Sequence, residues 1–297
     1  MKRTAFLSLF LLPTLLNAQG SSVGEANLKL LFPARTTSMA EAAIADSATM
    51  TSYFANPACL ASSNSVQVMF SQMQWIQDIQ TQQLATSLPT SLGSFVFALS
   101  NTSVNDIPIR DTPGPPLGTF DSHSTVFQLG YAFNPAQEYS IGASVKYLYD
   151  KLYQDEATGY GLDLGVNYRS PIEGASVALA ILNVGKMNAF RSQKTDLPTR
   201  VDAGIQYAFS AEDFGFLGGV VLGHETASDG LTNFRVGGEV TYEQLLAVRI
   251  GYQTGYDIRG LSAGLGIEYS LVQLDYAYVP FSQGFGNANI ITIGFKF

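Results

Sequence analysis

The sequence predicts an all-β protein: a transmembrane antiparallel β-barrel of about 14 strands with a short N-terminal plug segment. First, residues 125–149 alternate between an apolar and a mixed face, in two runs of about ten residues around the turn 134–138, and this length suits a tilted membrane-spanning strand. Second, only 13% of the residues are charged, 12% are aromatic, and glycine occurs 28 times. Third, the final strand presents four apolar residues on one face: Ile291, Ile293, Phe295 and Phe297.

The amino terminus predicts export from the cytoplasm. It starts with Lys2 and Arg3, continues with an apolar run from Ala5 to Leu16, and reaches the small residue Ala18. This is the pattern of a secretory signal peptide, and the run is too short to span a membrane as a helix. We therefore assign residues 1–18 to a signal peptide.

Residues 19–64 lack strand alternation and are predicted to form an N-terminal plug, or hatch, in or against the lumen. The Ala-rich stretch Ser38–Ile44 predicts a short helix. The motif Asn56, Pro57 and Ala58 follows it. A periplasmic extension is the alternative, because periodicity alone does not separate the two.

Residues 65–297 are predicted to form the barrel. We expect strands near 65–74, 79–88, 93–101, 123–133, 139–149, 158–168, 175–183, 200–209, 215–224, 233–242, 246–253, 261–269, 271–279 and 289–297. Their even number agrees with bacterial single-chain barrels.

The connections between these strands alternate in length. Those near 89–92, 134–138, 169–174, 210–214, 243–245 and 270 are short, and those near 102–122, 150–157, 184–199, 225–232, 254–260 and 280–288 are mostly longer. Short periplasmic turns and longer external loops are typical of outer-membrane barrels, whereas a soluble β-sandwich gives no reason for the alternation. Counting back from the terminus places an aromatic girdle at the periplasmic ends of lipid-facing strands: Phe133, Tyr168, Phe209, Tyr242, Tyr269 and Phe297. We therefore expect the mature protein in the lipid of a Gram-negative type outer membrane.

Ten charged residues lie within strands on the face opposite the apolar one: Lys146, Asp163, Arg200, Asp202, Arg235, Glu239, Arg249, Glu268, Asp275 and Lys296. An Arg or Lys facing lipid at mid-depth costs roughly 2–4 kcal/mol, so these residues are predicted to face the lumen. Five are positive and five negative, which suggests cross-strand pairs such as Lys146 with Asp163 and Arg249 with Glu268. Such charges more often hold a lumen together than select a solute.

Other classes of function find little support. A net charge of −8 argues against a nucleic-acid partner. His123 and His224 lack a second ligand at metal spacing, and no nucleophile–base pair is visible, so we expect no metal, no cofactor and no enzyme activity. Cys59, the only cysteine, excludes an internal disulfide and fits a small buried residue.

Several motifs resemble those of the PorV/PorQ family of outer-membrane proteins. They are Ala34-Arg35, Met39, Ala42 to Ala45 with Asp46, Asn56-Pro57-Ala58-Cys59-Leu60, Ile107-Pro-Ile-Arg110, Pro116-Leu-Gly-Thr-Phe120, Lys146-Tyr147, Thr158 to Gly165, Leu182-Asn-Val-Gly185 and Leu197-Pro-Thr199. The Asn-Pro-Ala core also recurs in FadL-type transporters of hydrophobic solutes. Ala40 and Cys59 depart from the family, which often has Gly at those positions.

The resemblance implies a FadL-like barrel of fourteen strands with its N-terminal segment in or near the lumen. It also implies a role in type IX secretion. There, studied PorV members bind the C-terminal signal domains of exported cargo and pass them to a surface-attachment complex.

Two functional interpretations stay open, beside a purely structural barrel. The first is the cargo shuttle; the alternative is a FadL-like transporter of hydrophobic small molecules. The compact chain favours the first, because FadL-type proteins usually carry longer external loops. The predicted partner surface is the Pro-rich external loop Asn105–Phe120, and within it Ile107, Arg110, Pro115, Pro116 and Phe120. A rigid cap over the barrel mouth is the alternative role for this loop.

Overall fold

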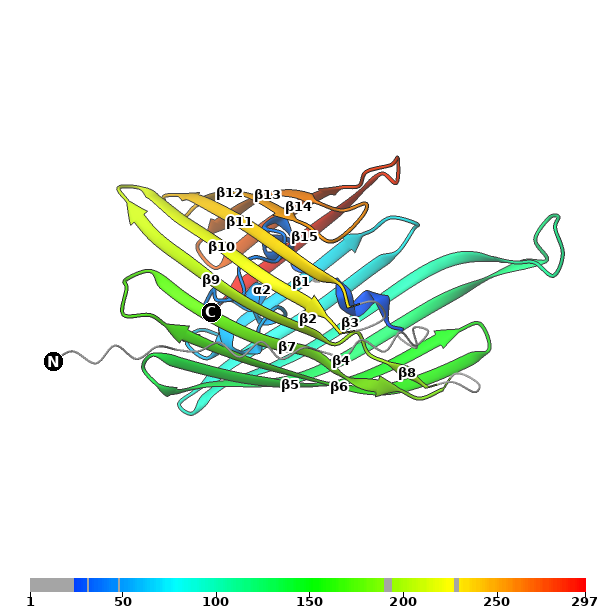
Figure 1. Cartoon of the computed structure of the whole chain (residues 1–297), viewed down its shortest axis with the longest axis horizontal. Coiled ribbons are helices and arrows are strands. Elements are labelled where there is room, and N and C mark those ends of the chain that lie inside the picture. The colour runs from blue at the N-terminus through cyan, green and yellow to red at the C-terminus, as the bar shows by residue number, and fades with distance from the viewer. Residues whose placement is uncertain (1–23, 31, 48, 190–193, 227–229) are drawn as a thin grey trace.

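The strands form one closed antiparallel barrel (Figure 1). The computed structural model describes residues 24–30, 32–47, 49–189, 194–226 and 230–297, so the expected signal peptide lies outside the described residues. The strands are β1 (Gln67–Gln74), β2 (Gln80–Thr90), β3 (Gly93–Ile109), β4 (Gly118–Ala136), β5 (Tyr139–Leu152), β6 (Asp155–Arg169), β7 (Ala175–Met187), β8 (Thr195–Asp196), β9 (Arg200–Ala211), β10 (Phe214–Glu225), β11 (Thr232–Tyr242), β12 (Leu246–Gln253), β13 (Leu261–Tyr269), β14 (Val272–Pro280) and β15 (Asn287–Lys296). Because the two-residue β8 only adds to the edge of β7, the described chain has a barrel of fourteen strands, as predicted.

Closure depends on pairing between the first and last strands. Val68 of β1 opposes Phe295 of β15, and the amide of Phe297 donates to the carbonyl of Val66 over 2.9 Å. Around the wall, each long strand pairs with a neighbour on both sides. Closure therefore leaves no open row of backbone polar groups facing lipid, which a bilayer does not tolerate.

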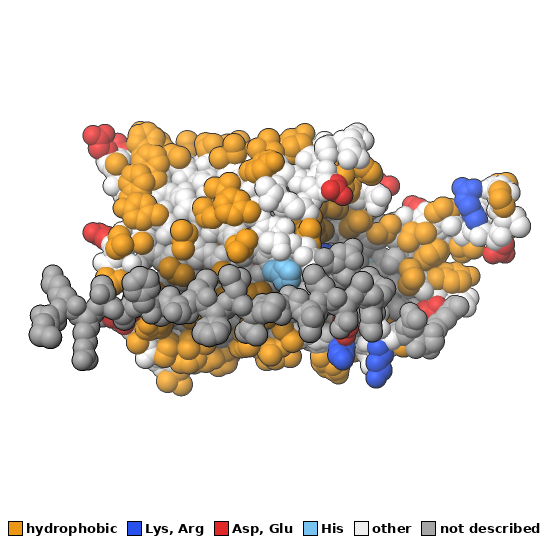
Figure 2. All heavy atoms as spheres, in the orientation of Figure 1, with side chains coloured by type: hydrophobic (Ala, Val, Ile, Leu, Met, Phe, Trp, Pro, Cys, Tyr) orange, Lys and Arg blue, Asp and Glu red, His pale blue; other side chains and the backbone are white. Residues whose placement is uncertain are grey.

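Side chains alternate across the wall, as β12 illustrates. Its outward positions are exposed and mostly apolar: Leu246, Val248, Ile250 and Tyr252. The positions between them are buried and face the lumen: Ala247, Arg249, Gly251 and Gln253. Over the visible face of the barrel, hydrophobic side chains cover the middle and charged side chains gather toward the two ends (Figure 2). This is the surface that a protein crossing the hydrocarbon layer presents.

The two ends of the barrel differ. The short-turn end carries the connections 91–92, 137–138, 170–174, 212–213, 243–245 and 270–271, and the long-loop end carries 75–79, 110–117, 153–154, 188–199, 226–231, 254–260 and 281–286. The six expected girdle aromatics lie close to the short-turn ends of their strands. Rings pair across strands there, with centroids 5.0 Å apart for Tyr139 and Tyr168 and 5.1 Å apart for Phe214 and Tyr242.

The predicted loop 102–122 is largely wrong. β3 continues to Ile109 and β4 begins at Gly118, and the resulting hairpin projects far beyond the barrel (Figure 1). Likewise, longer β5 and β6 reduce the predicted loop 150–157 to a two-residue turn.

Local irregularities explain why the alternation of side chains in the sequence did not predict this hairpin. The register of β3 shifts between Val104 and Ile107, and Asp106 has a φ of 57°, so the period-two alternation is broken. Pro108 usually argues against a strand, but it is tolerated here because β3 has no partner on its β2 side beyond Ser103.

The described residues before β1, the plug segment 24–64, lie inside the barrel. Four short helices occur in it: η1 (Ala26–Lys29), α1 (Ala34–Ser38), α2 (Met50–Tyr53) and η2 (Pro57–Leu60). Helix α1 contacts β12 to β15, α2 contacts β1 and β2, and η2 contacts β4 to β6. The segment enters at the long-loop end, where Gly24 bonds Asp196, and leaves at the short-turn end, where Asn134 bonds the Ala61 carbonyl. The wall therefore surrounds it on several sides.

The helix predicted over Ser38–Ile44 is wrong, because α1 ends where it was expected to start. Ala40 and Glu41 have φ values of 52° and 62°, in the left-handed region that interrupts a helix. This conformation turns the Glu41 carboxylate toward the wall, where two arginines bind it. Tertiary contacts thus override the local helix propensity of alanine. No helix in the described residues has the length and apolarity needed to cross a membrane.

Candidate functional site: the plugged lumen and its mouth

Eight of the ten predicted lumen charges are buried: Lys146, Asp163, Arg200, Asp202, Arg235, Glu239, Arg249 and Asp275. The other two, Glu268 and Lys296, are partly exposed and pair with each other over 2.7 Å. Three of the buried residues, Arg200, Arg235 and Glu239, pair with charged side chains of the plug segment, in two networks.

The first network is built around Arg35 of α1. Its Nε and Nη2 donate to the two carboxylate oxygens of Glu239 over 2.9 and 2.8 Å, and its Nη1 pairs with Asp46. Glu239 also pairs with Arg249, whose Nη1 donates to Asp275 over 2.7 Å. Burial lowers the pKa of Arg35, but the Asp46 and Glu239 charges outweigh it, so the pKa lies well above its usual value. Arg35 is therefore a permanent cation fixed between plug and wall.

The second network is built around Glu41. One of its oxygens accepts from Nη1 of Arg200 over 2.9 Å and from Nη1 of Arg235 over 3.0 Å. Both arginines also pair with Asp202. Burial would raise the pKa of Glu41, but the charges of Arg200, Arg235 and Arg259 outweigh it and lower the pKa. Removing one member of such a buried network typically costs 3–5 kcal/mol, because a charge is left unpaired.

Sequence reasoning missed the plug side of both networks. Arg35, Glu41 and Asp46 are the charged residues of an otherwise uncharged, Ala-rich stretch. That isolation was the available signal, since a charge in a buried segment needs a partner.

Of the two suggested pairs, Lys146–Asp163 is present, with Nζ 2.9 Å from Oδ2. The pair Arg249–Glu268 is wrong. Arg249 instead opposes Glu239 on β11, and the last pairing of β12 with β13 joins Leu246 to Ile267, so Glu268 lies beyond the end of β12. Register, which composition does not reveal, decides between these partners.

A bulge between β6 and β7 links the Lys146–Asp163 pair to the plug segment. At this bulge Asn183 has a φ of 60°, and its amide donates to Asp163 over 2.8 Å. Its side chain accepts from Lys146 Nζ over 2.6 Å and donates to the Leu28 carbonyl over 3.2 Å. The wall therefore holds the start of the plug segment through its main chain.

The motif Asn56, Pro57 and Ala58 anchors the plug segment near the short-turn end. Asn56 is fully buried, caps η2 by accepting from the Ala58 amide over 3.0 Å, and donates to the Ile44 carbonyl over 2.9 Å. It also bonds Asn167 of the wall over 2.5 Å. The motif thus fixes a turn inside the plug and attaches that turn to β6.

Glycines of the wall make room for the plug. A Cβ at Gly142 would overlap the Pro57 backbone, and one at Gly165 would overlap the Asn56 side chain. The same holds on further strands, where an added Cβ would meet residues 38–44 or 53 of the plug: Gly130, Gly204, Gly219, Gly237, Gly251 and Gly264. The small residues on the inner face therefore serve close packing between wall and plug.

Two apolar clusters line the long-loop half of the lumen. One consists of Val126, Leu148, Ala157, Met187 and Leu197, with Leu28 of the plug packed against it. The other, the mouth cluster, consists of Phe32, Ala34, Met73, Ala277, Val279, Ala288 and Ile290, with Leu30, Trp75 and Phe281 packed against it. Plug side chains therefore fill an apolar mouth above the charged interior.

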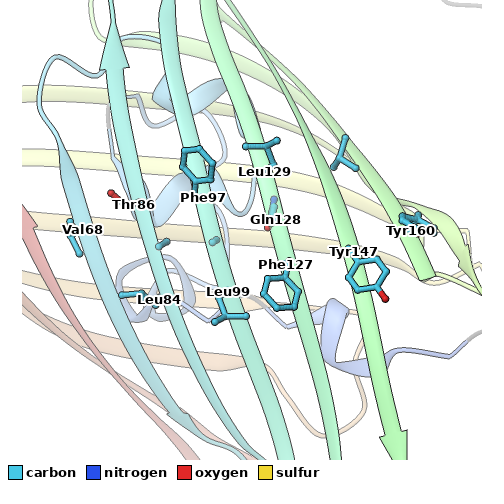
Figure 3. Close-up of a pocket in the computed structure, with 13 residues that line it drawn as sticks. Val68, Leu84, Thr86, Phe97, Leu99, Phe127, Gln128, Leu129, Tyr147 and Tyr160 are labelled. Atoms are coloured by element: carbon cyan, nitrogen blue, oxygen red, sulfur yellow. The ribbon is translucent and has the colours of Figure 1, made fainter. Parts of the chain in front are cut away.

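A further apolar surface lies outside the lumen. A hollow of about 580 Å³ on the outer wall is lined by side chains of β1 to β6, including Leu84, Phe97, Phe127 and Tyr147 (Figure 3). These residues are between 36% and 52% exposed. The hollow therefore belongs to the lipid-facing surface and holds no part of the plug.

The residues of the predicted partner surface all lie on the projecting hairpin. Ile107 and Phe120 are strand residues that oppose each other, whereas Arg110, Pro115 and Pro116 lie in the turn between β3 and β4.

A closed barrel with an apolar outer face and a charged, plugged lumen defines an outer-membrane β-barrel protein. Among solved structures, the chain is similar to a monoaromatic hydrocarbon channel, CymD, with a TM-score of 0.58, 12% identity, and coverage of 91% of this chain and 97% of that one. It is also similar to the Pseudomonas putida toluene transporter TodX, with a TM-score of 0.57, 8% identity, and coverage of 88% and 97%.

At such identities the likeness is one of fold. No protein-family model matches the sequence, and no curated protein does.

Proposed function

We propose that this protein conducts small hydrophobic molecules across the outer membrane, with the plug segment as its gate. The observation that carries the proposal is the apolar mouth: two buried clusters at the long-loop end, each completed by plug side chains. The names of the structural neighbours, a hydrocarbon channel and a toluene transporter, support the same class of solute.

The mouth suits a hydrophobic solute for a simple physical reason. Transfer of apolar surface from water into an apolar site contributes about 25 cal/mol per Å². A solute that takes the place of Leu28, Leu30 or Phe32 keeps the wall clusters covered. Further passage requires the plug to shift, because the Arg35 and Glu41 networks occupy the middle of the lumen.

A charge placed in the mouth tests this proposal. Val279 is buried in the mouth cluster, and Ser282 lies exposed in the following loop. Cells producing Val279→Asp should take up labelled ethylbenzene more slowly than cells producing the wild type. Ser282→Asp, with the same charge outside the cluster, should match the wild type. Heat-dependent gel mobility would check that both variants fold. Equal uptake by cells with the wild type, Val279→Asp and Ser282→Asp would mean that the solute does not pass through the mouth.

Docking of a cargo signal domain is a second candidate, favoured by the projecting hairpin. Ile107, Ile109 and Phe120 lie on one face of it by register, and the rings of Phe120 and Tyr153 are 5.3 Å apart. Such an apolar face outside the membrane suits a protein partner. Replacing residues 107–120 with a short Gly/Ser linker should abolish pull-down of a cargo signal domain while the barrel still assembles. Unchanged pull-down would end this candidacy.

A further inference from the structure

Arg259 is a buried cation at the long-loop end that forms no ion pair with either charge network, although its charge helps to lower the pKa of Glu41. It lies in the connection between β12 and β13 and is only 7% exposed. Its guanidinium lies 4.5 Å from the ring centroid of Tyr256 and 5.7 Å from that of Trp75, and its main chain pairs with Phe281. Aromatic faces stabilise such a cation, but they do not neutralise it.

Arg259 forms no direct ion pair among the described residues, and the carboxylate whose charge it senses, Glu41, is bound by Arg200 and Arg235. No carboxylate there lies within 4.0 Å of its guanidinium, and its N–H groups donate no hydrogen bond. They are also not among the fully enclosed polar atoms without a partner, so they face accessible space. The guanidinium can therefore receive an acceptor from outside the protein.

The carboxylates near Arg259 already form ion pairs with other cations. Glu41 and Asp202 bind Arg200 and Arg235, and Glu225 binds Lys29 over 3.0 Å. Together with Arg259, this region therefore holds four cations and three carboxylates. The cations are Lys29, Arg200, Arg235 and Arg259. Tyr256 does not supply the missing anion, because it donates its hydroxyl to Glu225 over 2.7 Å, and burial together with nearby carboxylates raises its pKa to about 12.

The surroundings of Arg259 are apolar and aromatic. Trp75 and Phe281 pack against the mouth cluster and meet edge to face, with centroids 5.0 Å apart. A single unpaired guanidinium thus stands at the rim of the apolar surface that the proposed function uses.

We propose that Arg259, Trp75, Tyr256 and Phe281 bind a small aromatic carboxylate, with its carboxylate on the guanidinium and its ring against Trp75 and Phe281. This rests on the proposed function and narrows its solute class. A planar guanidinium binds a carboxylate through two parallel hydrogen bonds, whereas a neutral hydrocarbon leaves the cation unpaired. An aliphatic chain would use the apolar cluster but forgo the aromatic faces.

Trp75 reports on this site directly, because it is the only tryptophan in the chain. We would titrate the purified full chain in detergent with benzoate and with benzyl alcohol, a neutral analogue of similar size, and follow Trp75 emission. Wild-type protein should bind benzoate at least ten-fold more tightly. In Arg259→Gln the ratio of the two affinities should fall at least ten-fold, and Arg259→Lys should restore part of it. Arg169→Gln, an exposed cation at the short-turn end, should keep the wild-type ratio.

Equal affinity for benzoate and benzyl alcohol in the wild type would overturn the proposal, as would an unchanged ratio in Arg259→Gln. So would a Trp75 response to chloride or phosphate as strong as that to benzoate, since the site would then select charge alone. Uptake of ethylbenzene by cells distinguishes a failure of the proposed function from a failure of the carboxylate site at Arg259. If cells take up ethylbenzene but the purified protein does not prefer benzoate, only the inference about Arg259 is wrong. If cells take up neither ethylbenzene nor benzoate, the proposed function is wrong as well.

Discussion

Gly218 and Gly219 show how strongly a single inner-face residue can constrain the plug. They are neighbours in β10, but a Cβ at Gly219 would overlap the Ala42 carbonyl, whereas one at the outward Gly218 would meet no atom within 4 Å. Both substitutions to valine favour a strand equally. Their difference therefore isolates the contact between wall and plug.

We expect Gly219→Val to lower the free energy of unfolding by about 1–3 kcal/mol, the usual cost of overpacking, and to raise ion conductance in planar bilayers. Gly218→Val should change stability by no more than about 0.5 kcal/mol and leave conductance low. Thermal unfolding in detergent and single-channel recording measure both quantities. Identical behaviour of the two variants would mean that Ala42 does not pack against β10 as described.

We expect Glu25 to make the docking of the plug segment's first residues depend on pH. Its pKa is raised to about 9, first by burial and then by a hydrogen bond to Asp150, whose charge acts in the same direction; a hydrogen bond from Ser124 opposes this. A raised pKa means that the docked segment holds the proton more tightly than the free one. Docking is therefore fully favoured below the free value of 4.5 and weakens as the pH rises from there to about 9.

Hydrogen exchange of residues 24–30 should accordingly become faster, relative to its intrinsic rate, across that pH range. In Glu25→Gln this relative rate should stay flat, since the amide does not titrate. A flat profile in the wild type would contradict a raised pKa of Glu25 in the docked segment.

At the scale of elements, the plug segment lies in the lumen that the strands enclose. Between them, helices α1, α2 and η2 contact nine of the fourteen barrel strands: β1, β2, β4 to β6 and β12 to β15. Deleting residues 24–54 removes Arg35, Glu41 and Asp46 and leaves the η2 anchor. The barrel should still form, because its strands pair without the plug.

We therefore expect this deletion to raise conductance in planar bilayers well above that of the wild type. Heat-dependent gel mobility would verify that the barrel has assembled. If an assembled deletion variant stays closed, loops or inner-wall side chains block the pore, and the plug is not the gate.

At the scale of the whole molecule, the sequence predicted the barrel well because one physical rule repeats along it. A strand with lipid on one side and polar contacts on the other must alternate, and the ends of β9 to β14 lie within one or two residues of the expected positions. The rule did not predict the β3–β4 hairpin for two reasons. Beyond the barrel neither face of the hairpin meets lipid, and the bulge at Asp106 breaks the period-two alternation.

The site was harder to predict than the fold. Buried charges such as Arg249 follow from alternation, but their partners depend on register and on the path of the plug, which has no period. Ala40 and Glu41 illustrate this, since contacts with the wall set their left-handed backbone. The apolar mouth was not predicted, because it brings together residues that are far apart in the sequence, such as Phe32 and Ile290.

The most direct test of hydrophobic conduction is the solute selectivity of cells that carry the wild-type protein. Initial uptake rates of labelled ethylbenzene and of a polar solute of similar size would be compared with those of cells lacking the protein. The apolar mouth and the closed, charged middle predict faster uptake of ethylbenzene and an unchanged rate for the polar solute. Equal acceleration of both would indicate an open aqueous pore, and no acceleration of ethylbenzene would contradict a transport role.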